Sequence, residues 1–151
     1  MAPDWLDDDE QRVWRNFLSM GTRLQAAMNR QLQLDCGLSL ADYEVLVALS
    51  ERDGMRILEL AEWIGWEQSR LSHQLARMRS RELVGRSDDT YDRRGATVEI
   101  TAAGRGALAA AAPGHVALVR SVMFDAITPT QLRELDRLTK SALARLDEYA
   151  R

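Results

Sequence analysis

Apolar residues recur at spacings of three and four near both ends of the chain, which is the pattern of one helix face. The first stripe lies in Glu10–Leu34 and predicts a helix of about 25 residues. Its members are Val13, Phe17, Met20, Leu24 and Ala27. Gly37 follows Cys36 and can end that helix in the left-handed conformation. Near the other end, Thr128 is a typical N-cap before Pro129. The stripe that follows predicts a second long helix and consists of Leu132, Leu135, Leu138, Ala142, Leu146 and Tyr149.

A third long helix is predicted from Thr101 to about Ala126, with a kink or an interruption at Pro113-Gly114. A long helix with a single apolar stripe must pack against another element. A chain of 151 residues with three such helices and a separate middle section has little core to cover all of them. We therefore expect a homodimer in which residues 1–36 and 101–151 form a helical dimerisation region.

The middle of the chain, residues 37–100, is predicted to hold a helix–turn–helix. A helix is predicted over Leu40–Leu49. Two further short helices follow over Ile57–Ile64 and Gln68–Arg81, and Gly65 lies in the turn between them. In the second of these, three residues are expected to point into the core: Leu71, Leu75 and Met78.

The outer side of this second helix has a composition that suits a DNA groove. Its residues are Ser69, Arg70, Ser72, His73, Gln74 and Arg77. Hydroxyl groups suit phosphate contacts, and Arg and Gln side chains suit base edges. A solvated helix face without this role, which is the alternative, more often carries Glu/Lys pairs four residues apart. The pattern therefore favours a DNA-binding helix.

Two strand-like segments, Leu83–Ser87 and Ala96–Ile100, follow the helix–turn–helix and enclose a charged, turn-rich stretch. Such a hairpin would complete a winged helix. Arg93 and Arg94 at its tip are expected to enter a minor groove, where narrow A·T tracts concentrate negative potential. Asp92 is interpreted as an intramolecular partner that positions one of these arginines. The alternative is a surface ion pair that contributes little to stability.

The chain resembles the MarR family of bacterial transcriptional regulators. The residues that carry the resemblance are Leu60-Ala61, Ser69, Leu71-Ser72, Leu75, Met78, Leu83-Val84, Arg86, Asp92, Arg94, Ile100-Thr101 and Gly104. The resemblance covers nearly the whole chain, because that family also places dimerising helices on both sides of its winged helix. It implies a mainly α fold with a small β-wing, in which long terminal helices flank the winged helix–turn–helix. The family usually has glycine before its Leu-Val pair, where this chain has Glu82.

The resemblance also implies a function. It implies a homodimeric repressor or activator that binds a pseudo-palindromic operator in double-stranded DNA, and of the two we expect a repressor. The helix Gln68–Arg81 would lie in a major groove, and Arg94 would be the wing-tip residue in a minor groove. Many family members respond to small aromatic or phenolic effectors in a cleft between the dimer helices and the winged helix. The candidate pocket residues on the helices around that cleft are Trp14, Phe17, Tyr43 and His115.

The net charge is −3, from 20 Lys and Arg against 23 Asp and Glu, so any DNA contact must use a local positive charge. Residues 68–97 contain seven arginines and four acidic residues, a local +3, while the other 121 residues sum to −6. A composition that is 46% hydrophobic and 28% charged excludes a disordered or fibrous chain. No uninterrupted apolar run reaches the roughly 18 residues that span a bilayer, and the acidic N-terminus has no signal pattern. We therefore expect a cytoplasmic protein without membrane association.

Catalysis and bound cofactors are not expected. The chain has no nucleophile elbow, no Gly-rich phosphate loop, and too few His and Cys residues for a zinc site. Two further functions stay open. The net charge of −3 is compatible with a winged-helix protein-interaction module that does not bind specific DNA. The single cysteine, Cys36, allows an oxidant-sensing regulator, although its neighbour Asp35 and the lack of an adjacent basic residue favour a structural cysteine.

Overall fold

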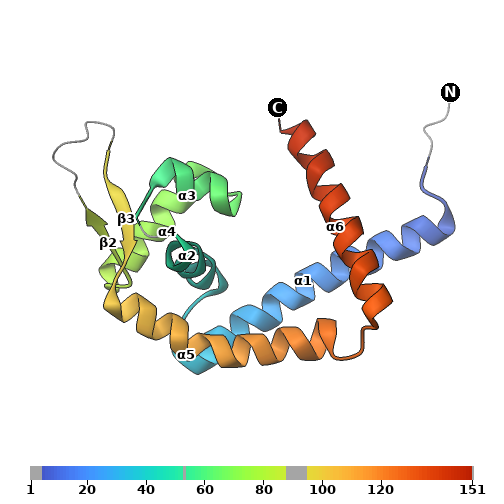
Figure 1. Cartoon of the computed structure of the whole chain (residues 1–151), viewed down its shortest axis with the longest axis horizontal. Coiled ribbons are helices and arrows are strands. Elements are labelled where there is room, and N and C mark those ends of the chain that lie inside the picture. The colour runs from blue at the N-terminus through green and yellow to red at the C-terminus, as the bar shows by residue number, and fades with distance from the viewer. Residues whose placement is uncertain (1–4, 53, 88–94, 151) are drawn as a thin grey trace. The chain divides into compact units, whose positions relative to one another are not determined.

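The computed structural model describes residues 5–52, 54–87 and 95–150 (Figure 1). Its elements, in chain order, are α1 (Asp8–Cys36), α2 (Leu40–Glu51), β1 (Met55–Arg56), α3 (Ile57–Ile64), α4 (Gln68–Ser80), β2 (Val84–Ser87), β3 (Thr97–Ile100), α5 (Ala102–Val119), the π-helix η1 (Arg120–Phe124) and α6 (Pro129–Tyr149). The described residues therefore form a mainly α fold with a three-stranded sheet. This confirms the predicted fold class and the predicted helices, whose ends differ by no more than about two residues when η1 is counted with α5.

Contacts divide the chain into two units, Met1–His115 and Val116–Arg151. The first unit contains α1 to α4, the sheet and most of α5, while the second contains the end of α5, η1 and α6. The divisions predicted from the sequence fall instead after residues 36 and 100, between the expected dimerisation and DNA-binding regions. The difference arises because α1 and α5 contribute to the same core as the helix–turn–helix, through the buried residues Leu32 and Ala111.

Side-chain caps explain where α2 and α6 begin. Ser39 Oγ accepts a hydrogen bond from Asp42 N at 3.0 Å, and Asp42 Oδ2 accepts one from Ser39 N at 2.9 Å. Thr128 and Gln131 form the same reciprocal arrangement at the start of α6. Gly37, with φ of 68°, ends α1 in the predicted left-handed conformation. These boundaries are therefore set by residues close together in the sequence.

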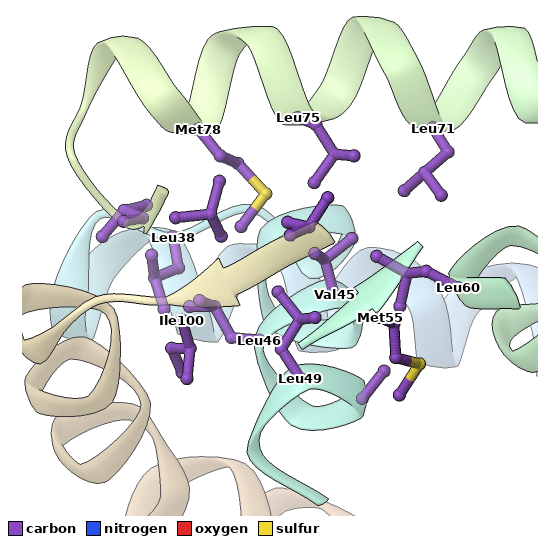
Figure 2. Packing of buried hydrophobic residues seen from close by; sticks show 14 of the residues in the cluster. Leu38, Val45, Leu46, Leu49, Met55, Leu60, Leu71, Leu75, Met78 and Ile100 are labelled. Carbon is purple, nitrogen blue, oxygen red and sulfur yellow. The ribbon is translucent and has the colours of Figure 1, made fainter. Parts of the chain in front are cut away.

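The helices α3 and α4 form the predicted helix–turn–helix. Gly65 ends α3 with φ of 73°, a conformation that glycine adopts without strain. The carbonyl oxygen of Ala61, which is buried, accepts a hydrogen bond from Trp66 N at 2.9 Å. Figure 2 shows the inward side of α4 above the core, with Leu71, Leu75 and Met78 pointing toward the labelled residues Val45, Leu46 and Leu49 of α2 and Ile100 of β3. The predicted inward side of α4 is therefore confirmed.

The sheet has the order β1-β3-β2, and both pairs of strands are antiparallel. Val84 of β2 lies opposite Ile100 of β3, and Met55 of β1 lies opposite Val98 of β3. The sequence did not predict β1, because two residues are too few to show alternation. The predicted wing-tip residues Asp92, Arg93 and Arg94 lie outside the described residues.

The helix α5 continues through Pro113, so the interruption expected there is not found. Pro113 has no backbone N–H, and the carbonyl of Ala109 therefore lacks its usual intrahelical donor. The helical pattern changes instead at η1. Ala102–Phe124 has a mean hydropathy of 1.4 in one 18-residue window and is long and apolar enough to cross a membrane by length and composition alone, a test that helices of soluble proteins also pass. Only 6% of that window is buried within the chain, and such a surface also suits packing against another protein chain.

Two backbone positions lie where α4, β2 and α5 meet. Glu82 has φ of 59°, in the left-handed region that is costly for a side chain with a Cβ. Gly104 is buried, and a Cβ at that position would meet the carbonyl oxygen of Leu83. Thr101 Oγ1 accepts a hydrogen bond from Gly104 N at 3.0 Å and donates to Glu82 O at 2.6 Å. This junction therefore requires a residue without a side chain at position 104.

Candidate nucleic-acid interface and ligand pocket

The outer side of α4 carries most of the side chains that were predicted to contact DNA. Ser69, Arg70, His73 and Arg77 are exposed, and Ser72 is half-buried. Ser72 Oγ donates a hydrogen bond to the carbonyl oxygen of Gln68 at 2.9 Å. This surface presents hydroxyl, imidazole and guanidinium groups, which are donors suited to phosphates and base edges.

Arg70 is held near the start of α4 by an aromatic ring. The guanidinium carbon of Arg70 lies 3.9 Å from the centroid of the Trp66 ring, which is a cation–π contact. The positive charge of Arg70 also acts on Glu44 of α2, where it opposes the effect of burial on the pKa. Arg70 therefore belongs to the outer side of α4 and also interacts with a residue of α2.

Gln74 does not lie on the outer side of α4, and that prediction is wrong. Its side chain is buried, and its Nε2 donates a hydrogen bond to Asp42 Oδ1 at 2.6 Å. Gln74 follows Leu71 by three positions and precedes Met78 by four, so it belongs to the inward stripe of the helix. Its Oε1 accepts a hydrogen bond from Arg77 at 2.7 Å. Gln74 is therefore part of the buried side of α4 and bonds to an arginine whose side chain is exposed.

Asp42 is the centre of a buried polar network that is not among the features predicted from the sequence. It is 1% exposed, and its Oδ2 accepts hydrogen bonds from Ser39 N and from Arg81 Nη1, the latter at 2.6 Å. Arg81 also donates to the carbonyl oxygen of Gly37 at 2.9 Å. With the bond from Gln74, one carboxylate joins α2, the middle of α4, the residue that follows α4 and the segment that precedes α2. The signal in the sequence is an acidic residue at the third position of the mostly apolar helix Leu40–Leu49, three positions after Ser39.

A pocket of about 370 Å³ lies within the first unit, a size typical of small-molecule sites. Its lining residues are Met28, Leu40, Tyr43, Glu44, Val47, Ala48, Glu51, Trp63, Ile64 and His115. The structure brings together two of the predicted pocket residues, since the rings of Tyr43 and His115 lie 4.4 Å apart. The other two, Trp14 and Phe17, do not line this pocket. They stack on each other on the exposed surface of α1, with ring centroids 5.8 Å apart.

Partial burial changes the acid–base behaviour of three pocket residues. Burial raises the pKa of Tyr43 and lowers the pKa of His115, so both neutral forms are favoured at pH 7. Burial also raises the pKa of Glu44, and the charge of Arg70 partly offsets this effect. His115 Nδ1 is buried and has no hydrogen-bond partner among the residues that the structure describes. The pocket thus combines aromatic rings, neutral polar groups and acidic side chains.

Cys36 is half-buried, and its Sγ donates a hydrogen bond to the carbonyl oxygen of Leu32 at 3.2 Å. This contact gives no support to an oxidant sensor, and that function stays a hypothesis. Within residues 5–52, 54–87 and 95–150, no group of three or more His, Cys, Asp or Glu residues could hold a metal ion.

The helix–turn–helix, the antiparallel strand pair that follows it and the long helices on both sides define a winged-helix protein. The MarR family model matches residues 38–95. AbsC, a MarR family transcriptional regulator from Streptomyces coelicolor, is 40% identical with a TM-score of 0.89, and the match covers 95% of this chain and 98% of AbsC. Sco3205, a MarR family regulator from the same organism in complex with DNA, is 38% identical with a TM-score of 0.88, over 93% of this chain and 89% of Sco3205. The chain belongs to the MarR family of transcriptional regulators, as the resemblance predicted.

The fold is also found in more distant structures. CouR from Rhodococcus jostii, bound to p-coumaroyl-CoA, is 24% identical with a TM-score of 0.76, and the match covers 92% of this chain and 94% of CouR. At this identity the similarity concerns the fold alone. No protein in the curated set of sequences matches the chain.

Proposed function

We propose that the chain is a homodimeric transcriptional repressor that binds a pseudo-palindromic DNA operator. The observation that carries this proposal is the exposed side of α4, where Arg70 and Arg77 form no ion pair with another described residue. A relative with 38% identity, Sco3205, has a structure in complex with DNA. This relative favours DNA binding over a winged-helix module that binds only proteins.

In the proposed complex, α4 lies in the major groove. The hydroxyl groups of Ser69 and Ser72 contact phosphates, while Arg70, His73 and Arg77 contact base edges or phosphates. Gln74 keeps Arg77 in place through their hydrogen bond of 2.7 Å. The wing residues Arg93 and Arg94 enter the flanking minor groove, and Asp92 shapes the wing. Those three wing residues lie outside the part of the chain that the structure describes.

Exposed apolar side chains support the proposed homodimer. They occur on α1, α5, η1 and α6 and include Val13, Trp14, Phe17, Leu18, Met20, Val116, Val122, Phe124, Leu132, Leu138, Leu143 and Leu146. Burying one such side chain is worth about 1.5–3 kcal/mol, so a second copy of the chain that covers them gains a large apolar area. A two-fold dimer requires operator half-sites spaced by about 10–10.5 bp, one turn of DNA.

The pocket that contains Tyr43 and His115 is the proposed effector site. A small aromatic ligand there releases the operator by favouring a dimer in which the spacing of the two α4 helices no longer fits successive major grooves. The ligand must bind the released state more tightly than the DNA-bound state for this to occur.

Fluorescence anisotropy on labelled DNA tests the proposal. The duplex comes from the intergenic region upstream of the protein's own gene, and a random duplex is the control. Arg70→Ala and Arg77→Ala are each expected to weaken specific binding about tenfold, while Arg94→Ala is expected to weaken it more than about tenfold and to leave the dimer intact. Arg145→Ala is the matched control, because Arg145 is an exposed arginine of α6, outside the helix–turn–helix.

Salt dependence separates the possible outcomes. An affinity for the operator that decreases steeply with salt supports phosphate contacts. A larger loss of affinity for Arg94→Ala than for Arg70→Ala or Arg77→Ala supports the assigned contacts of the wing and of α4. Equal losses for Arg145→Ala and Arg77→Ala contradict the assignment of DNA contacts to α4. An absence of binding to either duplex at low salt rejects the regulator and favours the protein-interaction module.

A further inference from the structure

The pocket contains two carboxylates, Glu44 and Glu51, but its lining includes no arginine or lysine. We propose that it binds small organic cations that carry an aromatic or alkyl group, in preference to carboxylates and phenolates of the same size. This inference deepens the proposed function, since it takes the pocket as the effector site. It also departs from the phenolic effectors that the family resemblance implies.

The two carboxylates lie along one wall of the pocket. Glu44 and Glu51 both belong to α2 and are seven positions apart, so they project from the same side of the helix with a rise of about 10.5 Å between them. Neither forms an ion pair with another described residue. A cation in the pocket would therefore meet negative charge that no neighbouring side chain neutralises by direct contact.

Aromatic rings supply the second component of a cation site. Tyr43 from α2 and Trp63 from α3 line the same pocket as the carboxylates. A cation is attracted to the face of such rings within about 6 Å of their centroids. Trp66, three positions after Trp63, already holds the guanidinium of Arg70 at 3.9 Å in this way. The apolar side chains of the lining suit the hydrocarbon part of the ligand: Met28, Leu40, Val47 and Ile64.

An anionic ligand finds no positive charge in this lining. Among the lining residues only His115 could become cationic, and burial lowers its pKa, so its neutral form predominates at pH 7. A carboxylate or phenolate would therefore face Glu44 and Glu51, and the one positive charge described as acting on them, that of Arg70 on Glu44, comes from outside the lining. The buried Nδ1 of His115 has no partner among the described residues, and it offers one hydrogen bond to a polar group on the ligand.

Isothermal titration calorimetry on the full-length protein, without DNA, tests this inference. The probes are benzyltrimethylammonium, benzyl alcohol and benzoate, which share one ring and differ in charge. We expect the affinity to decrease in that order. The double variant Glu44→Gln, Glu51→Gln is expected to bind the cation about tenfold more weakly and benzyl alcohol with little change. Glu62→Gln is the matched control, because Glu62 is an exposed acidic residue of α3 that does not line the pocket.

Three results overturn the inference. The first is benzoate binding as tightly as the cation. The second is a cation affinity that Glu62→Gln reduces as much as the double variant does. The third is no binding of any probe.

Both substituted residues are exposed, so the double variant is expected to fold, and its circular dichroism spectrum and melting temperature check this. DNA binding is measured separately by anisotropy. Operator binding without cation binding therefore rejects only the inference about the ligand. Cation binding without operator binding rejects only the proposed DNA-binding regulator.

Discussion

Asp42→Asn is expected to reduce the free energy of unfolding by about 2–3 kcal/mol. Both oxygens of the Asp42 carboxylate accept hydrogen bonds, Oδ1 from Gln74 Nε2 and Oδ2 from Ser39 N and Arg81 Nη1. An asparagine has one acceptor oxygen and one NH₂ group. In either orientation of the amide, its NH₂ group would therefore face another donor.

Burial sets the size of this effect. Asp42 is 1% exposed, and a hydrogen bond to a buried charged group contributes about 1.5–3 kcal/mol. Removing one partner of a fully buried ion pair costs about 3–5 kcal/mol. The Arg81 side chain is 42% exposed, so it regains hydration when the carboxylate is lost, and its share of the cost is smaller. The expected loss of unfolding free energy, about 2–3 kcal/mol, is therefore below the loss of about 3–5 kcal/mol for a fully buried ion pair.

Urea unfolding followed by circular dichroism measures this loss. Each variant is compared at one protein concentration, because a dimer's apparent stability depends on concentration. Asp136→Asn is the matched control: Asp136 forms an exposed ion pair with Lys140 at 2.7 Å, and its loss is expected to cost less than about 0.5 kcal/mol. If Asp42→Asn costs no more than Asp136→Asn, the buried network does not stabilise the packing of α4 on α2.

Gly104→Ala is expected to destabilise the chain by about 1–3 kcal/mol, because its Cβ would meet the Leu83 carbonyl oxygen. Thermal unfolding checks this against Gly106→Ala, which has open space and is expected to stabilise α5 by about 0.5–1 kcal/mol. Glu82→Gly is expected to stabilise the fold by about 0.5–1 kcal/mol, since it relieves a φ of 59°; a lower urea midpoint would contradict this. Cation binding is expected to weaken as the pH falls. Burial raises the pKa of Glu44, and a bound cation favours its carboxylate, so affinity is complete above that pKa and is lost as the pH falls through it. Calorimetry across the pH range checks this, and Glu44→Gln should show a smaller dependence.

Features that depend on neighbours in the sequence could be predicted. The left-handed Gly37 and Gly65 mark helix ends because a glycine follows an apolar stripe at each position. Leu71 and Met78 were placed inward by helical spacing alone, and both are buried. Such features need only local geometry, which one sequence contains.

Features that depend on distant residues could not be predicted. Gln74 was assigned to the outer side from its chemistry, although its spacing from Leu71 matches the inward stripe. Its partner Asp42 is 32 positions away, and nothing in the local pattern indicates that pairing. Trp14 was chosen for the pocket because it lies on α1, but the pocket lining includes Met28 as the residue from that helix. Which part of a long helix faces a cavity depends on packing that the periodicity does not specify.

The position of α2 connects the two proposed sites. Asp42 bonds to Gln74 of α4, and the next two residues, Tyr43 and Glu44, line the pocket. The charge of Arg70 also acts on Glu44 from α4. A ligand that shifts α2 must therefore either break the short bonds of a buried carboxylate or move α4 along with α2. In the proposed regulator, ligand occupancy and operator affinity are linked through this helix, so bound DNA must change the ligand affinity by the same factor.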